Sequence, residues 1–73
     1  MRFAENLVRL QGEHMETNYR LAKVLGVHPS TIQNWRDGRS PSLELLGRVA
    51  RHYGTTVEAL LGRVETVNEA DSI

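Results

Sequence analysis

The chain has 73 residues, which is the size of one small domain and near the lower limit for folding by hydrophobic burial alone. It contains no cysteine, which excludes disulfides and thiolate metal sites, and no apolar run reaches the roughly 18 residues of a membrane span. No charged start leads into a long apolar stretch, so we expect a cytoplasmic protein.

The nine basic and nine acidic side chains cancel, but they are distributed unevenly. Residues 1–54 hold eight Lys or Arg and five Asp or Glu, a net charge of +3, whereas residues 55–73 hold one Arg and four acids, a net charge of −3. A neutral total counts against nucleic-acid binding, for which a basic domain is expected. We expect a folded domain in residues 1–62 and an acidic tail in residues 63–73, which either extends the last helix or is disordered.

The first two predicted elements are helices, and no stretch alternates apolar and polar residues as a strand would. A first helix, ending near residues 12–14, is predicted by apolar residues at helical spacing. These residues are Phe3, Leu7 and Leu10. A second helix is expected to begin near Thr17 and to end at Gly26. Its apolar positions are Leu21, Ala22 and Leu25.

A third helix is predicted to begin at Pro29, because the missing N–H of proline suits the first helical position. Either His28 or Ser30 is expected at its start, and Gly38 is a natural stop at its end. Its apolar positions are Ile32 and Trp35.

A fourth helix follows the loop sequence RSPS and is predicted to end at Gly54. Its apolar positions are Leu43, Leu46, Val49, Ala50 and Tyr53. Thr55 and Glu58 match a capping box at the start of a fifth helix. The apolar positions of this helix are Val57, Leu60 and Leu61. It either ends at Gly62 or continues through residues 64–67.

Five short helices with connections of a few residues predict a compact all-α five-helix bundle. The expected core consists of Leu7, Leu10, Leu21, Ala22, Leu25, Val27, Ile32, Trp35, Leu46, Val49, Ala50 and Leu60. A core of this size gives a net stability of only about 3–5 kcal/mol.

The second and third predicted helices together form a helix-turn-helix pattern. Gly26 lies where the chain must turn sharply, which requires a positive φ that glycine tolerates best. The start of the third helix then projects from the body, the end that DNA-binding proteins place in the major groove. Its polar side chains can contact base edges, and its N-terminus suits a phosphate. These side chains are Ser30, Thr31, Gln33 and Asn34. The alternative is an ordinary solvent-exposed helix face.

The resemblance to a known family extends beyond this pattern. The run LAKVLGVHPSTIQNWRDGRSPSLELLGRVARHYGTTVEALLG resembles the Cro/C1-type (XRE-type) helix-turn-helix family of phage and bacterial repressors. With the preceding residues it covers residues 18–61, about 44 of the 73 positions. The resemblance implies a lambda-repressor-like five-helix bundle that is commonly a dimer on an inverted-repeat operator. It also implies a sequence-specific, double-stranded DNA-binding transcriptional regulator, in this case a repressor.

The resemblance assigns roles to residues around the third helix, which spans about residues 29–37. The positions that read bases are Pro29, Ser30 and Asn34, with Gln33 nearby. The positions at the DNA backbone are Asn18, His28, Thr31, Arg36, Arg39 and Ser40. Pro29 donates no hydrogen bond and offers only van der Waals contact, for example with a thymine methyl group.

Three further departures from the family's pattern concern charge and burial. Gln11 and Arg36 occupy positions where the family often pairs an arginine with a glutamate, so that ion pair is absent. We predict that Arg36 is either free to reach solvent or phosphate, or held by Gln11. Asp37 is acidic beside the DNA backbone, which weakens binding unless it points away. Met15 or Glu16 falls where an apolar residue is usual.

A dimer interface is predicted from apolar residues that a small bundle cannot all bury. These are Leu60, Leu61, Val64 and Val67, which alternatively cover the base of the bundle. The three histidines have no metal-ligand spacing, and we expect no metal, no cofactor and no enzymatic activity. The alternative function is a protein-interaction module such as an antitoxin, which the neutral charge and acidic tail favour slightly. The polar third helix with Arg36 and Arg39 favours DNA.

Overall fold

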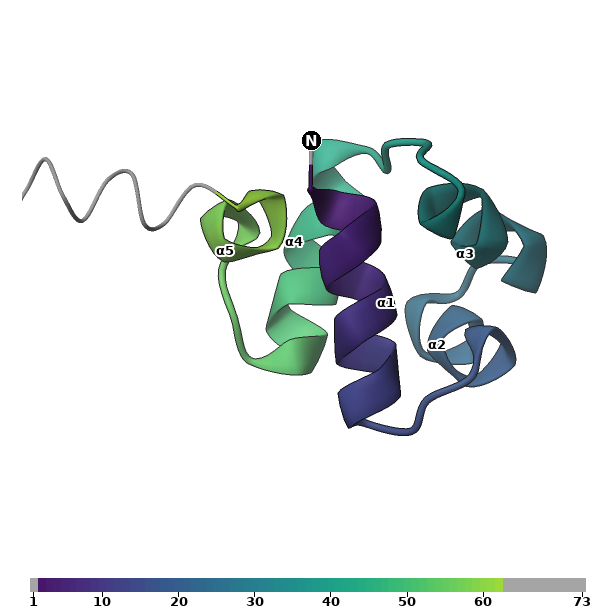
Figure 1. Ribbon diagram of the computed structural model, residues 1–73. Coiled ribbons are helices and arrows are strands. Elements are labelled where there is room, and N and C mark those ends of the chain that lie inside the picture. Colours follow the sequence, from purple (N-terminus) through teal and green to yellow (C-terminus); the bar gives the residue numbers. More distant parts are fainter. Residues whose placement is uncertain (1, 63–73) are drawn as a thin grey trace, which may run out of the picture.

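The computed structural model describes residues 2–62 and is all-helical in that range, as predicted (Figure 1). The five helices are α1 (Phe3–Glu13), α2 (Asn18–Leu25), α3 (Pro29–Arg36), α4 (Leu43–Tyr53) and α5 (Val57–Leu61). The five-helix prediction is therefore confirmed. The acidic tail, with Val64 and Val67, lies outside the described residues.

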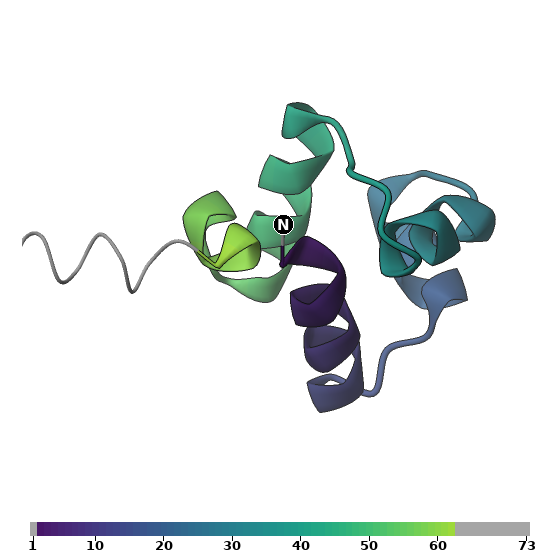
Figure 2. The ribbon, with the colours of Figure 1, turned by 45° about the horizontal axis from the view of Figure 1, so that its top comes forward.

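Helix α1 lies between two groups of helices (Figures 1 and 2). The pair α2 and α3 packs on one side of it, and the pair α4 and α5 packs on the other. Contacts between α2 and α4 join the two groups. The helix-turn-helix formed by α2 and α3 thus makes up one side of the bundle, and α1 packs against the inner face of α3.

The core forms where the buried faces of all five helices meet. It consists of Phe3, Leu7, Leu21, Ala22, Leu25, Ile32, Trp35, Leu46, Val49, Ala50 and Leu60. Phe3 meets Trp35 edge to face, with ring centroids 5.9 Å apart. The prediction was wrong for Leu10 and Val27, which are only partly buried and pack at the edge of this core.

Leu60 belongs to the core of the domain itself, so its assignment to a dimer interface was wrong. Its side chain is fully buried within one chain, because α5 packs this residue inward against α1 and α4. A residue with no exposed surface cannot contact a second copy. Leu61 is half-buried and remains available.

Polar side chains cap the N-terminal ends of most helices, and glycines in the left-handed conformation follow the C-terminal ends of α2, α4 and α5. Thr17 caps α2, His28 caps α3, and Gly26 ends α2 at φ 74°. The capping box predicted at Thr55 was wrong. The hydroxyl oxygen of the next residue, Thr56, accepts from the backbone N–H of Ala59, which lies at the third position of α5. The N–H of Thr55 instead donates to a carbonyl of α4, completing the preceding turn.

Candidate nucleic-acid interface

The N-terminus of α3 is fixed by its own first residues. Pro29 occupies the first turn, and Nδ1 of His28 accepts a hydrogen bond of 3.1 Å from the backbone N–H of Ser30. The same ring nitrogen lies 2.9 Å from Ser30 Oγ. The two alternatives for the start of this helix are thereby resolved in favour of His28 as the cap, with Ser30 bound to it.

One face of α3 is buried and the other is open. Ile32 and Trp35 point into the core, whereas Ser30, Gln33 and Asn34 are exposed. Pro29 and Thr31 are half-buried at the flanks. Three of the four residues assigned to base reading therefore lie together on the solvent side of one helix, with Ser30 and Asn34 one turn apart, whereas Pro29 lies at its flank.

Side chains of three helices meet in a continuous line of hydrogen bonds, which we call the amide relay. Its members, in order, are Arg36, Gln11, Asn18, Gln33 and Asp37. Nη1 of Arg36 donates to Gln11 Oε1 at 2.6 Å, and Nε2 of Gln11 donates to Asn18 Oδ1 at 3.0 Å. Nδ2 of Asn18 donates to Gln33 Oε1 at 3.0 Å, and Nε2 of Gln33 donates to Asp37 Oδ1 at 3.0 Å.

The relay answers two questions raised by the sequence. Arg36 is half-buried and held by Gln11, the second of the two predicted alternatives. The exposed carboxylate of Asp37 is held in one orientation, because it accepts a hydrogen bond from Nε2 of Gln33. Gln11 is almost completely buried, with 3% of its surface exposed, and sequence reasoning did not place it in the core. The signal was its spacing, since Gln11 follows Leu7 by four residues on the same helix face.

The loop between α3 and α4 is attached to α3 through its backbone. The N–H of Arg39 donates to the carbonyl of Asn34 at 3.0 Å, and Pro41 is buried. The side chains of Arg39 and Ser40 are exposed beside the end of α3. The backbone bond thus holds the start of this loop beside Asn34, one of the predicted base-reading residues.

The connection between α1 and α2 contains an acidic residue where an apolar one is usual. Met15 adopts φ 52° and is 87% exposed, whereas the carboxylate of Glu16 turns inward. Glu16 Oε2 lies 2.7 Å from His52 Nε2, and its other oxygen accepts from the hydroxyl of Tyr53. Burial, reinforced by this hydrogen bond and the carboxylate charge, raises the pKa of Tyr53. These contacts fasten the segment before α2 to the end of α4.

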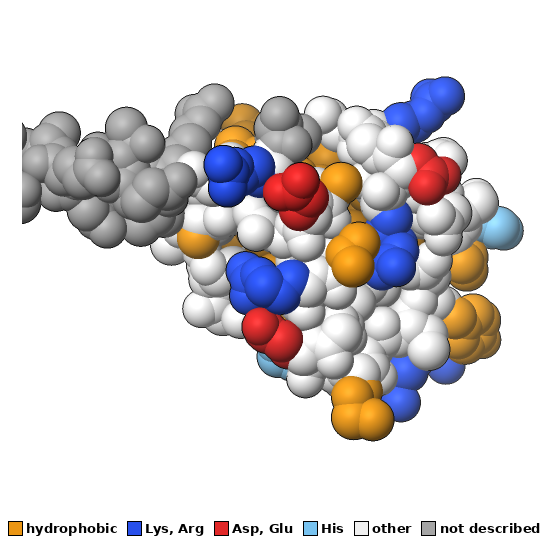
Figure 3. All heavy atoms as spheres, in the orientation of Figure 1, with side chains coloured by type: hydrophobic (Ala, Val, Ile, Leu, Met, Phe, Trp, Pro, Cys, Tyr) orange, Lys and Arg blue, Asp and Glu red, His pale blue; other side chains and the backbone are white. Residues whose placement is uncertain are grey.

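Charge is mixed on the visible surface. On the face drawn in Figure 3, Lys and Arg side chains are interspersed with Asp and Glu rather than gathered into one basic stripe. Attraction to phosphate on such a surface comes from individual side chains more than from a broad field.

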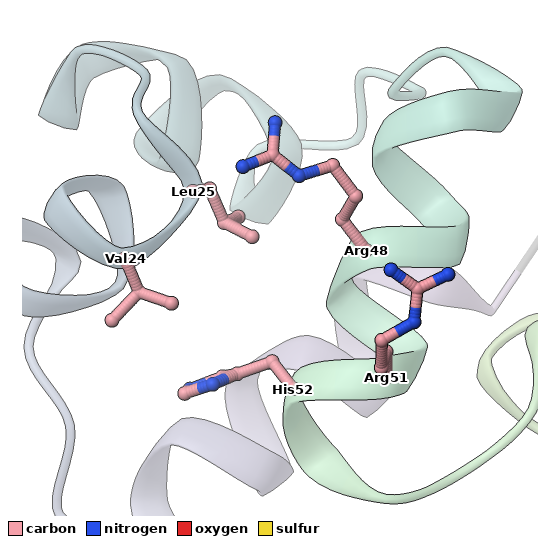
Figure 4. Close-up of a pocket in the computed structure, with 5 residues that line it drawn as sticks. All are labelled: Val24, Leu25, Arg48, Arg51 and His52. Atoms are coloured by element: carbon pink, nitrogen blue, oxygen red, sulfur yellow. The ribbon is translucent and has the colours of Figure 1, made fainter.

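A groove with a different character lies between α2 and α4 (Figure 4). Val24 and Leu25 line it from α2, and Arg48, Arg51 and His52 line it from α4. Val24 is 52% exposed, and the side chain of Arg48 extends across the opening towards α2. The groove therefore joins an apolar wall to a cationic one, and no carboxylate lines it.

The described part of the chain holds neither a metal-binding cluster nor a membrane-spanning helix. Within residues 2–62, no three His, Cys, Asp or Glu side chains gather in a way that could hold a metal ion. In the same range, no helix is long and apolar enough to cross a membrane.

Comparison with known proteins identifies the domain type. Residues 15–60 match a helix-turn-helix protein family. Among solved structures, the chain is similar to HppE in its Fe(II) form, with 35% identity over 80% of this chain and 31% of HppE, and a TM-score of 0.73. For Fe(II) HppE with substrate the identity is 34% over 81% of this chain and 34% of HppE, with a TM-score of 0.74. The chain thus spans about a third of HppE. No curated protein sequence matches it.

Proposed function

This chain belongs to the helix-turn-helix family of the XRE or Cro/C1 type, and from that premise we propose that it is a sequence-specific transcriptional regulator. In this proposal α3 enters the major groove of double-stranded DNA and the domain acts as a repressor. Occupancy of the operator is sufficient for repression, so neither catalysis nor a cofactor enters the mechanism.

The observation that carries the proposal is the composition of the open face of α3. Ser30, Gln33 and Asn34 are exposed there, and all three can donate and accept hydrogen bonds. Their backbone is held rigidly from the other side, where Ile32 and Trp35 are buried. A reading surface on a packed helix loses little conformational freedom on binding, which favours specific recognition.

Contacts to the DNA backbone are proposed for residues that surround this face. His28, Arg39 and Ser40 are exposed at the two ends of α3 and are the best placed. Asn18 keeps one N–H beyond the relay for a phosphate. Two more predicted positions, Thr31 and Arg36, are half-buried, which supports a smaller contribution from each.

A dimer on an inverted repeat completes the proposal. Two copies related by a two-fold axis would present their α3 helices roughly 34 Å apart, one turn of DNA. Within the described residues the proposed interface uses the half-buried Leu61. The remaining interface residues proposed from the sequence, Val64 and Val67, lie outside residues 2–62.

The groove between α2 and α4 favours a second candidate function, that of a protein-interaction module. A partially exposed Val24 beside Arg48 and Arg51 fits an acidic partner segment with an apolar anchor. In that case DNA would not be the main partner. The two functions predict different salt dependence, because about six phosphate contacts lower DNA affinity roughly a thousandfold between 50 and 200 mM salt.

Selection from random duplex DNA tests the proposal. The wild type is compared with a Ser30→Ala/Asn34→Ala double variant, and with Arg9→Ala/Glu13→Ala as the matched control. Arg9 and Glu13 are also exposed residues one turn apart, but they form an ion pair on the outside of α1. We expect an inverted repeat enriched by the wild type and the control and lost by the double variant. No enrichment by the wild type would favour the protein-interaction function.

A further inference from the structure

The amide relay has a direction that its two ends impose. Arg36 carries only hydrogen-bond donors, and an ionised Asp37 carboxylate carries only acceptors. Between them stand three side-chain amides, each with a donor group at one end and an acceptor at the other. Every amide must therefore turn its oxygen towards Arg36 and its nitrogen towards Asp37, which is the arrangement observed.

Reversing one amide is costly because each takes part in two junctions. A reversed Gln11 would place its nitrogen against the guanidinium of Arg36 and its oxygen against Asn18 Oδ1, losing both relay bonds at once. It would also lose the bond of 3.4 Å that Nε2 donates to the backbone carbonyl of Glu16. Gln11 is buried, so water cannot replace those bonds. The orientation of the exposed Gln33 amide is consequently held from both ends, by Asp37 at the end of its own helix and by Asn18, which Gln11 orients from α1.

The relay leaves part of Gln33 unused. Its Oε1 has accepted one hydrogen bond and keeps a second lone pair, and its Nε2 has donated one N–H and keeps another. One donor beside one acceptor is the pair that recognises N7 and N6 of adenine in the major groove.

We propose that Gln11 is a positioning residue for base recognition, which sets the amide of Gln33 for an adenine without itself approaching DNA. This inference rests on the proposed DNA-binding function. Gln11 acts through Asn18, whose amide lies between it and Gln33. Base preference at one pair of each half-site therefore depends on a buried side chain of α1.

The test is a base-preference profile obtained by duplex selection with single variants. Gln33→Ala locates the base pair that Gln33 reads. Gln11→Met keeps the volume of the buried side chain and removes both of its relay bonds. Gln11→Glu keeps an acceptor for Arg36 but has no donor for Asn18. Glu13→Gln, an exposed change on the same helix, is the matched control.

We expect the wild type to prefer adenine at the Gln33 position roughly tenfold, the size of one good side-chain–base pair. Both Gln11 variants should reduce that preference to about twofold and leave the other positions unchanged, and Glu13→Gln should match the wild type. Relative preferences do not depend on the fraction of folded protein, so partial unfolding cannot imitate this result.

The other outcomes overturn the inference in distinguishable ways. If the wild type enriches a sequence and the Gln11 variants keep its full profile, Gln11 has no positioning role, although the proposed function stands. A uniform weakening at all positions assigns Gln11 a structural role alone. If Gln33→Ala alters no base preference, the relay does not serve recognition. If the wild type enriches nothing, the proposed function fails and the inference fails with it.

Discussion

Replacing Phe3 with alanine tests how far the packing of α1 against the buried face of α3 stabilises the domain. Phe3 is the first residue of α1 and is fully buried. Its ring meets Trp35, which lies on the buried side of α3, with centroids 5.9 Å apart. The pair joins α1 directly to the helix that carries the proposed reading face.

The expected loss is comparable with the whole stability of the domain. Truncating a buried phenylalanine costs about 3–5 kcal/mol through lost transfer free energy and the cavity left behind. The edge-to-face pair accounts for roughly 0.5–1.5 kcal/mol beyond burial. A bundle of this size has a net stability of about 3–5 kcal/mol, so Phe3→Ala should be largely unfolded at room temperature. Phe3→Leu keeps most of the apolar volume and should cost about 1 kcal/mol.

Urea titration measures both losses. Trp35 is the only tryptophan of the chain, so its fluorescence reports on the site, and circular dichroism reports on all the helices. The midpoint should fall modestly for Phe3→Leu, and Phe3→Ala should show almost no folded baseline. An alanine variant with the midpoint of the wild type would refute the reasoning, because Phe3 would then not support α3.

Three further predictions concern a cap, a turn and a titration. In chemical denaturation, Thr56→Ala should lower the free energy of unfolding by about 1 kcal/mol, whereas Thr55→Ala should change it much less. Gly26→Ala should cost roughly 1–2 kcal/mol in the same assay, because its φ of 74° strains any Cβ. The folded-state pKa of Tyr53 is raised, so the stability it contributes is complete below roughly pH 10 and is lost as the pH rises above it. Tyr53→Phe should flatten that alkaline decline in a pH series of urea midpoints, and an unchanged slope would contradict the burial of this hydroxyl.

Local sequence patterns predicted most of the fold. The helical spacing of apolar residues, Pro29 at a first turn and glycines at chain reversals depend on neighbours within a few positions. The open polar face of α3 followed in the same way, because Ile32 and Trp35 determine which side of that helix is buried. The error at Thr55 arose because two adjacent threonines match the same cap, and only the path of the chain after α4 selects Thr56.

Interactions between distant residues had no local signal. Glu16 faces inward because His52 and Tyr53 arrive beside it from α4, more than thirty positions away. Gln11 contacts Arg36 across a separation of 25 residues. The family resemblance offered this contact as one of two alternatives, and only the packed helices select it. A polar side chain on an apolar stripe can be buried only if partners reach it.

The sequence by itself determined five helices, a helix-turn-helix and a polar face on α3, because periodicity and turn chemistry act over a few residues. The sequence placed Leu60 both in the core and at a dimer interface, and only the tertiary structure decided between them. It also decided that three amides line up between Arg36 and Asp37. The physical reason is that burial and hydrogen-bond direction are properties of assembled surfaces. From the sequence, Gln33 is known only as a side chain that can donate and accept hydrogen bonds. In the fold, Asn18 and Asp37 also determine which way its amide points.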